Sequence, residues 1–317
     1  MTPAQAPAVM ARGLTKQFGA FVAVDHVDLS IASGEIVGFI GPNGAGKSTT
    51  IRMLCGLLRP SSGSAVVAGC DVRRHPEAVR EHIGYMSQKF SLYGDLTVRE
   101  NLQFFGGLYR VPRRDIEERI RTAVTMAGLE GREDALVQTL AGGWKQRLAL
   151  GCAILHRPPV LFLDEPTSGV EPEARRRFWD LIHELAAGGV TILVSTHYMD
   201  EAEYCNRIAL IDSGRIVAIG SPGELRRRRL GGTLYELECS ALGAALEALR
   251  QAPGVIDAAI FGDRLHVLLE RPEAAPQLQP LLAGRGLRAG APQAIAPSLE
   301  DVFVQLVSRP HTAQAAA

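Results

Sequence analysis

The stretch GPNGAGKST at residues 41–49 has the residue types and spacing of a loop that binds phosphate groups. Glycines let the backbone curl so that N–H groups point at phosphate oxygens, and a helix that begins there adds the positive end of its dipole. We expect Lys47 to bridge the β- and γ-phosphates of a nucleotide and Ser48 to coordinate Mg²⁺. The predicted nucleotide contacts are Gly41, Pro42, Asn43, Gly44, Ala45, Gly46, Lys47, Ser48 and Thr49.

Two adjacent carboxylates, in VLFLDEP at residues 160–166, could supply the complementary chemistry. The apolar residues predict a buried strand, and the carboxylates would emerge at its carboxyl end, where ligands bind in open α/β sheets. Asp164 is expected to hold Mg²⁺, directly or through water, and Glu165 to polarise an attacking water. An apolar run that ends in Asp-Glu could close any strand, but a phosphate loop earlier in the chain favours phosphoryl transfer.

Four mostly apolar runs predict the sheet that would position these groups. They are IVGFI (36–40), VLFL (160–163), VTILVS (190–195) and IALID (208–212). Apolar strands that alternate with helices are typical of a parallel sheet buried on both faces. Residues 8–33 instead alternate in polarity, as antiparallel strands do, and DSGR within residues 212–219 predicts a hairpin. The predicted fold class is therefore α/β.

The segment at residues 95–155 has a helical pattern instead. Ile116, Ile120, Ala123 and Ala127 recur at helical spacing and no convincing strand is present, so this segment is predicted as a helical insertion.

The pattern restarts at about residue 232 in the order strand, helix, strand, strand, helix, strand. This order predicts a small α+β domain, for which a ferredoxin-like fold is the candidate. We expect a nucleotide-binding domain at residues 1–225, the small domain at 226–310 and a disordered tail at 311–317.

Composition limits the class of protein. The 317 residues carry equal numbers of acidic and basic side chains, so bulk charge does not favour nucleic acid as a partner. Five cysteines without a CxxC pair argue against a disulfide framework or a zinc site, and favour a reducing cytosol. No apolar run approaches the about 18 residues of a membrane span, and the first residues lack signal-peptide features. We therefore expect any membrane role to come through a partner chain.

Five motifs occur together in this chain. They are GPNGAGKST, Gln88 in YMSQ, AGGWKQR at 141–147, LFLDEPTSGVEP and His197 in STHYMDEAE. With these motifs, the chain resembles the nucleotide-binding subunit of an ABC transporter over about residues 8–225. The stretches THYMDEAEYCNRI and PSLEDVFVQL (297–306) are similar to ATPase subunits of ABC-2-type exporters, including the multidrug branch.

The resemblance implies a P-loop NTPase fold of the ABC ATPase type, with a parallel-sheet core, an antiparallel β subdomain and a helical subdomain. It implies that two such domains close head-to-tail around two ATP molecules with Mg²⁺. The phosphate loop of one and the signature loop of the other would enclose each nucleotide. Closure would drive an ABC-2-type permease from the cytoplasmic face of the membrane, and hydrolysis would reset the cycle.

The resemblance also implies roles for three residues outside the two motifs described first. Phe18 matches the aromatic residue that stacks on adenine, although a core position is equally open to it. Gln88 matches the residue that contacts Mg²⁺ and the attacking water, with an exposed turn glutamine as the alternative. His197 matches the switch histidine at the γ-phosphate, with a structural histidine as the alternative.

The chain departs from the family pattern in the signature loop, which usually begins Leu-Ser-Gly-Gly. Ala141 replaces the serine, so a hydroxyl that would donate to the γ-phosphate is missing. A hydrogen bond to a charged group contributes roughly 1.5–3 kcal/mol, equivalent to about 10–100-fold in rate. Gly142 and Gly143 still allow close backbone approach, so the loop is predicted to be weakened, not abolished. Glu171, where the family usually has Asp, is a second departure.

The partners that the resemblance implies are an ABC-2-type permease and a second ATP-binding subunit. A homodimer is favoured because the other catalytic residues are intact, but a heterodimer with a different ATPase chain remains open. Phe90, Leu92 and Tyr93 could receive a helix of the permease or pack into the core.

Two other functions compete with ATP-driven export of a drug, lipid or other substrate. A soluble ABC ATPase of DNA repair, chromosome structure or translation is disfavoured, because the helical region is too short for an inserted coiled coil. The translation-factor type also carries two nucleotide-binding domains, and only one is present. A regulatory subunit with weakened hydrolysis is disfavoured by the intact Lys47, Asp164, Glu165 and His197.

Overall fold

The structure, a computed structural model, describes residues 6–89, 91–227 and 230–308. The chain divides into two compact units, Met1–Ser221 and Pro222–Ala317. The division expected at 225/226 would put α7 (Pro222–Arg226) in the first unit, whereas α7 packs against α10 (Leu299–Ser308) of the second. The tail predicted at 311–317 lies outside the described residues.

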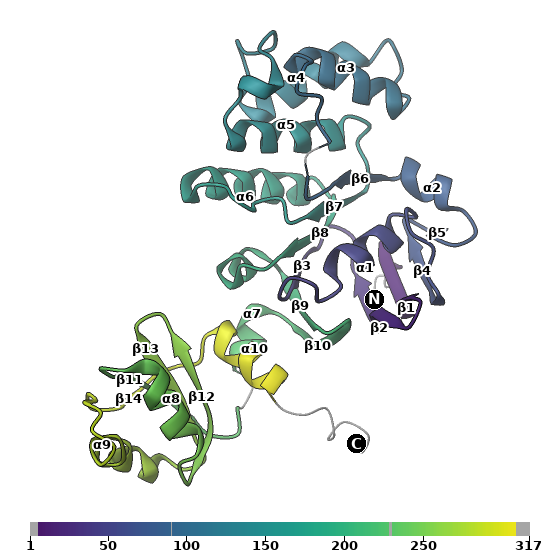
Figure 1. Ribbon diagram of the computed structural model, residues 1–317. Coiled ribbons are helices and arrows are strands. Elements are labelled where there is room, and N and C mark those ends of the chain that lie inside the picture. The colour runs from purple at the N-terminus through teal and green to yellow at the C-terminus, as the bar shows by residue number, and fades with distance from the viewer. Residues whose placement is uncertain (1–5, 90, 228–229, 309–317) are drawn as a thin grey trace, which may run out of the picture. The chain divides into compact units, whose positions relative to one another are not determined.

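A mostly parallel sheet forms the centre of the first unit (Figure 1). Its strands are β3 (Ile36–Ile40), β6 (Ile83–Met86), β7 (Val160–Asp164), β8 (Thr191–Thr196), β9 (Arg207–Asp212) and β10 (Arg215–Gly220). Among the described residues the order is β10-β9-β3-β8-β7-β6, and only the pair β10–β9 is antiparallel. Every residue of β3, β7 and β8 is buried, as expected for strands covered on both faces.

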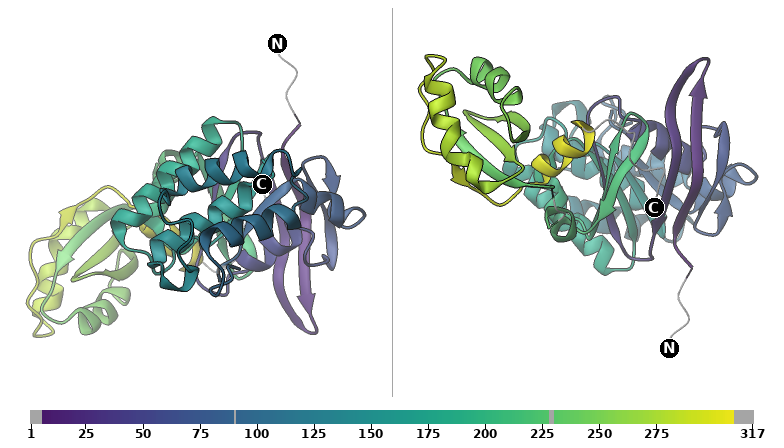
Figure 2. Two further views of the ribbon diagram at one scale, coloured as in Figure 1. Left: turned by 90° about the horizontal axis from the view of Figure 1, so that it is seen from above. Right: turned by 90° about the horizontal axis from the view of Figure 1, so that it is seen from below.

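A second, antiparallel sheet lies beside the first. Its strands are β1 (Val9–Phe18), β2 (Phe21–Ile31), β4 (Ser62–Val67) and β5 (Cys70–Asp71). Figure 2 shows β1 and β2 as a long strand pair at one side of the unit. One apolar core joins both sheets to α1 (Lys47–Leu54), with Leu14, Phe39 and Ile51 fully buried in it. This core fixes α1, and with it the phosphate loop, against the parallel sheet.

The remaining helices of this unit follow the strands. They are α2 (Pro76–Glu81), α3 (Val98–Leu108), α4 (Ile116–Ala127), the 3₁₀ helix η1 (Val137–Thr139), α5 (Gly142–Ile154), α6 (Pro172–Ala187) and the 3₁₀ helix η2 (Met199–Tyr204).

The segment predicted as a helical insertion contains α3, α4 and α5, which group together beyond β6 (Figure 1). Of the residues expected on one helical face, Ile120, Ala123 and Ala127 are buried in the core shared by these helices, and Ile116 packs against it. A capping box formed by Thr97 with the residue three positions later explains where α3 begins.

The second unit is a small α+β domain. Its further elements are β11 (Thr233–Glu238), α8 (Leu242–Arg250), β12 (Val255–Phe261), β13 (Arg264–Leu269), η3 (Pro272–Ala274), α9 (Ala275–Ala283) and β14 (Gln293–Ala294). Among its described residues the sheet order is β12-β13-β11-β14, all antiparallel. The side chains of α8 and α9 share a core with one face of this sheet, and Val302 of α10 packs on the other.

None of the helices in the described part of the chain is long and apolar enough to cross a membrane.

Candidate nucleotide site

The parallel pairing of β3, β8 and β7 brings the ends of these strands to one edge of the sheet. Ile40 is level with Thr196, and Asp164 is level with Ser195. Three chain segments therefore leave the sheet side by side, and they carry the phosphate loop, the carboxylate pair and the predicted histidine. This edge is where ligands bind in open α/β sheets.

The phosphate loop is held by its own lysine and by glycines that no other residue could replace. The Lys47 ammonium is buried and donates to the carbonyl oxygens of Gly41 at 2.7 Å and Pro42 at 3.0 Å. Gly46 has a φ of 102°, and a Cβ there would lie 2.6 Å from the carbonyl oxygen of Ala23. The close approach of β2 therefore requires glycine immediately before α1.

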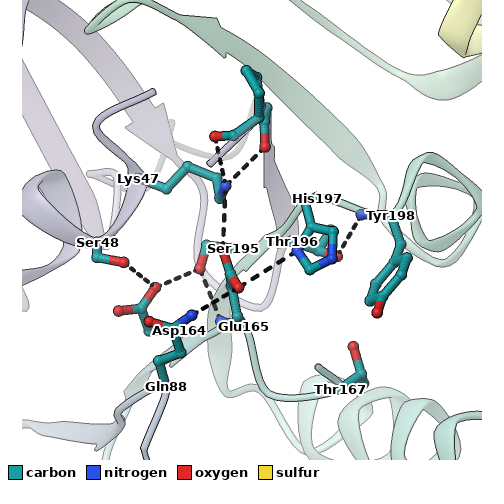
Figure 3. A network of polar contacts seen from close by, with 12 residues as sticks. Lys47, Ser48, Gln88, Asp164, Glu165, Thr167, Ser195, Thr196, His197 and Tyr198 are labelled. Carbon is teal, nitrogen blue, oxygen red and sulfur yellow. Dashed lines mark hydrogen bonds and ion pairs between the residues drawn. The ribbon is translucent and has the colours of Figure 1, made fainter. Parts of the chain in front are cut away.

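Polar side chains from the three segments form one network (Figure 3). The Asp164 carboxylate accepts from the Ser48 hydroxyl at 2.9 Å and from the Ser195 hydroxyl at 2.7 Å. Beside it, one Glu165 oxygen lies 3.2 Å from the Lys47 ammonium and the other accepts from the Gln88 side-chain amide at 3.1 Å. The structure thus brings together five side chains predicted from three motifs, of which Gln88 lies on a further segment after β6, and it adds Ser195.

His197 lies next to this network. Its Nδ1 is 3.4 Å from the second Glu165 oxygen, but that nitrogen is buried and makes no hydrogen bond of good geometry. The ring is partly exposed, with 28% of the side chain accessible. His197 therefore lies against the Glu165 carboxylate while part of its ring stays exposed.

Glu165 has a backbone conformation that is rare for a residue with a side chain. Its φ is 49°, in the left-handed region, which costs of order 1–3 kcal/mol and persists only where neighbours impose it. Ser195 imposes it here, because both the Ser195 carbonyl and its hydroxyl oxygen accept from the Glu165 N–H, at 3.1 and 3.0 Å. In this conformation the Glu165 carboxylate lies against Lys47 and Gln88.

The buried carboxylate of Asp164 affects nearby groups that are not part of the network. Burial, together with the Asp164 charge, raises the pKa of Tyr85 to about 12. The same two causes hold the pKa of the Cys55 thiol far above its usual range. Both groups therefore stay protonated at neutral pH, and Cys55 is excluded as a nucleophile.

The residues at this edge fit Mg²⁺. The second oxygen of Asp164 is buried without a hydrogen-bond partner, and the Ser48 hydroxyl lies beside the first. Magnesium takes one or two carboxylates and completes its octahedron with water and phosphate oxygens. No group of three or more His, Cys, Asp or Glu side chains suited to a metal occurs in the described residues.

Phe18 lies at the end of β1, outside the polar network. Nearly half of its side chain is exposed, and the Lys16 ammonium stands 5.0 Å from the ring centre. The core alternative for Phe18 is therefore wrong. An exposed ring in the hairpin that leads into β2 is available to stack on a base, because β2 also contacts the phosphate loop at Ala23.

The signature loop lies outside the polar network around Lys47, at the start of α5. Ala141 is the residue before α5, and Ala141 and Gly142 are exposed at the amino end of that helix. Ala141 makes no side-chain cap, and a Cβ on Gly143 would lie 2.9 Å from that of Ala174. Trp144 lies between the guanidinium groups of Arg132 and Arg147, at 4.7 and 4.6 Å from the ring centre. These residues take no part in the network around Lys47.

Four residues that join these segments were not predicted. Besides Ser195, they are Gln146, whose amide donates to the Pro166 carbonyl, Thr167, and Glu201, which is fully buried. Ser195 could have been found from its place at the end of an apolar strand, directly before Thr196 and His197. The burial of Glu201 has no sequence signal, because the acidic segment around it is typical of an exposed turn.

Comparison with known families gives matches over most of the chain. A family described as "ABC transporter" matches residues 24–168, which include the phosphate loop and both carboxylates. One described as "AAA domain, putative AbiEii toxin, Type IV TA system" matches residues 145–199. One described as "ATP-binding protein DrrA1-3-like, C-terminal domain" matches residues 220–307, which is nearly all of the described second unit.

Curated proteins match over one or both units. The probable multidrug ABC transporter ATP-binding protein YbhF of Escherichia coli K12 is 51% identical over 218 residues, 69% of this chain and 38% of that protein. The chain thus spans well under half the length of this relative. The Nod factor export ATP-binding protein I of Cupriavidus metallidurans is 37% identical and covers 94% of this chain and 96% of its own. The daunorubicin/doxorubicin resistance ATP-binding protein DrrA of Streptomyces peucetius is 36% identical and covers 96% and 93%.

Solved structures match the first unit. One described as the structure of an ATP-binding subunit of an ABC transporter has a TM-score of 0.64 and 31% identity, over 70% of this chain and 92% of its own. Another is a dimeric post-hydrolysis state of an ATP-binding cassette bound to ADP and Pi. It has a TM-score of 0.62 and 27% identity, over 67% of this chain and 98% of its own.

Proposed function

Because the chain belongs to the family of ABC transporter ATP-binding proteins, we propose that it hydrolyses ATP to drive export through a membrane-embedded partner. The observation that carries this proposal is the convergence of Lys47, Gln88 and His197 on the Glu165 carboxylate. Phosphoryl transfer needs charge neutralisation and an oriented water more than covalent chemistry, and this arrangement supplies both.

Each side chain has a role that follows from its position. Lys47 and the loop amides bind the β- and γ-phosphates, while Ser48 and Asp164 would hold Mg²⁺, whose chemistry is to neutralise phosphate charge. Glu165 orients the attacking water and accepts its proton. Gln88 holds the carboxylate in place from the opposite side, and His197 stabilises the charge that develops on the γ-phosphate.

Phosphate release from ATP by the purified chain tests this proposal. We expect release with Mg²⁺ and none above background when a chelator is in excess. The Asp164→Asn variant should retain little activity at saturating Mg²⁺, because it removes a metal ligand. Equal release with and without the chelator would contradict the proposed chemistry.

The signature loop supports a dimer in which each chain completes the site of the other. Ala141, Gly142 and Gly143 lie at an exposed helix start, apart from the network around Lys47 in the same chain. The dimeric cassette with ADP and Pi belongs to a protein with the same fold. We favour two copies of this chain over a pair of different chains, because the phosphate-loop residues are intact.

Mixing two impaired variants tests the homodimer. Lys47→Met impairs the phosphate-loop half of a site, and Gly143→Val impairs the signature half. In a head-to-tail homodimer, a mixed pair contains one site with both halves intact, so mixing should restore part of the activity. If the mixture stays as impaired as each variant alone, the homodimer is contradicted.

We propose that a groove of the first unit receives a segment of the permease. It has a volume of about 540 Å³ and is lined by residues of α2, β6 and the end of α3, with Leu57 and Leu108 more than half exposed. Of the residues first expected to receive a permease helix, Leu92 packs against the helical core, Tyr93 is exposed, and Phe90 lies outside the described residues.

Leu108→Asp tests this groove, since a charge there should weaken docking of an apolar helix. We expect less permease co-purified from membranes, with ATP hydrolysis by the isolated chain unchanged. Export through an ABC-2-type permease would place the chain peripherally at the cytoplasmic face of the membrane. The names of two relatives, a multidrug transporter protein and a daunorubicin/doxorubicin resistance protein, support a drug as the cargo.

A further inference from the structure

We propose that Glu201 is a positioning residue for ATP hydrolysis, which locks the chain segment carrying Glu165 against the segment carrying His197. The proposal rests on the proposed function and adds to it a residue that touches neither nucleotide nor water. Glu201 lies in η2, four residues after His197, and its side chain is completely buried.

The contact that carries the inference joins the two segments directly. The Thr167 hydroxyl donates to Glu201 Oε1 at 2.5 Å, and Thr167 follows Glu165 by two residues. The other oxygen of Glu201 is buried without a hydrogen-bond partner. A carboxylate removed from water with so few partners depends strongly on each one, so the Thr167 bond holds the two segments at a fixed separation.

A second contact to the same region is made by Arg175 of α6. The Arg175 guanidinium lies 3.5 Å from Glu201 Oε1 and stands 4.2 Å from the ring centre of Tyr198, the residue after His197. It also lies 3.6 Å from Asp200. Arg175 therefore neutralises the buried Glu201 carboxylate. It contacts three residues of the segment that begins at His197, namely Tyr198, Asp200 and Glu201. In Figure 3, Thr167 and Tyr198 are both drawn on the same side of the polar network.

The hydrogen bonds of Ser195 join the two segments where the strands end, but the contact between the Glu165 and His197 side chains beyond that point is loose. His197 Nδ1 and the Glu165 carboxylate are 3.4 Å apart without a well-formed hydrogen bond, and Glu165 is held in a left-handed conformation. Neither feature can set the separation of the two groups. Since a small misplacement of catalytic groups lowers the rate strongly, the rigid Thr167–Glu201 contact next to them is suited to set it.

Thr167→Val and Glu201→Gln test the proposal in the full-length chain. The first removes the hydroxyl with little change of shape, and the second removes the charge. We expect kcat to fall about tenfold in each, within the range for one hydrogen bond to a charged group, while KM for ATP stays about the same. Thr167→Ser restores the hydroxyl and should recover most of kcat. The double variant should lose little more than either single one, because both changes break the same contact.

Thr191→Val is the matched control. Thr191 is equally buried and its hydroxyl oxygen accepts from the Gly34 N–H at 3.0 Å, but it lies at the opposite end of β8 from His197. It should lose stability as Thr167→Val does and keep its kcat. The melting temperatures of all variants show which of them are folded.

The outcomes separate the positioning role from the proposed function. Unchanged kcat in folded Thr167→Val, failure of Thr167→Ser to recover it, or an equal loss of kcat in Thr191→Val would each overturn the positioning role. A rise in KM in place of a fall in kcat would also overturn it. Absence of ATP hydrolysis in the unsubstituted chain would instead contradict the proposed function itself.

Discussion

The two parts of the chain that are proposed to contact ATP are built in opposite ways. In the phosphate-loop half, the buried charged side chains Lys47, Asp164 and Glu165 come from two segments and hold the site together. The signature half, Ala141 to Gly143, has no polar side chain and lies at an exposed helix start. The first half is stable within one chain because its charges neutralise each other. The second offers only backbone N–H groups, and it becomes a site when another molecule covers it.

Glu165→Gln should have the largest effect in this comparison. The amide keeps the shape of the side chain but cannot accept a proton from water, so turnover should fall on the order of 10²–10⁴-fold. ATP binding should persist, because Lys47 and the loop amides remain. Phosphate release and binding of a fluorescent ATP analogue measure the two quantities, and normal hydrolysis by this variant would refute the role of Glu165.

Lys47→Met should have the second-largest effect, and it should weaken the binding of ATP. Loss of a charged contact to phosphate should weaken ATP affinity by about 10–100-fold. The substitution also leaves the buried Glu165 without its cation, so the melting temperature should fall as well. Titration with the fluorescent analogue gives the affinity, and an unchanged dissociation constant would contradict the assignment of the loop.

Gly143→Val should impair the signature half while leaving nucleotide binding to the phosphate-loop half unchanged. Its Cβ would crowd Ala174 and its methyl groups would cover the helix start, so turnover should fall about 10–100-fold, as for the loss of one phosphate contact. Binding of the nucleotide analogue to the phosphate-loop half should stay as in the unsubstituted chain. A parallel loss of binding would show that the phosphate-loop half cannot bind nucleotide without an intact signature half, and it would contradict the contrast drawn between them.

Ala141→Ser should have the smallest effect and gives two readouts. Ala141 has an extended N-cap conformation, φ −64° and ψ 157°, so a serine there should cap α5 and raise stability by about 0.5–2 kcal/mol. If the missing hydroxyl limits hydrolysis, turnover should also rise, by up to about tenfold. Greater stability with unchanged turnover would show that the cap forms and the phosphate contact is not limiting.

The sequence predicted the elements whose residues carry their own signal. The apolar runs of β3, β7, β8 and β9 and the glycines before α1 determined where the phosphate loop and the carboxylates meet. The strand β6 was missed, because it is short and contains Gly84, where a Cβ would lie 2.4 Å from the Ala153 carbonyl oxygen. That glycine is required by packing against α5, and such packing has no local pattern.

The site residues, like the strands and helices, were predictable where the local sequence carries its own signal. Lys47, Asp164 and Glu165 follow directly from motifs, whereas Thr167 and Glu201 matter because of a contact between residues 34 positions apart. Ser195 lies between these cases, since its strand was predicted but the two hydrogen bonds of its side chain to Asp164 and Glu165 were not. Residues that act through tertiary contacts become visible only when the segments are placed side by side.

The hydrogen bond from Gln146 to Pro166 couples the signature half of the chain to the phosphate-loop half. Gln146 lies on the helix that begins at the signature loop, and Pro166 follows Glu165 in the chain. In the proposed homodimer, a nucleotide of the second subunit that contacts the start of α5 would therefore also shift the peptide beside the Glu165 carboxylate of this chain. Thermodynamic linkage makes that influence reciprocal, so the two ATP sites would be coupled through this bond. We expect binding isotherms of the dimer with a Hill coefficient different from 1, and Gln146→Leu should bring that coefficient back toward unity.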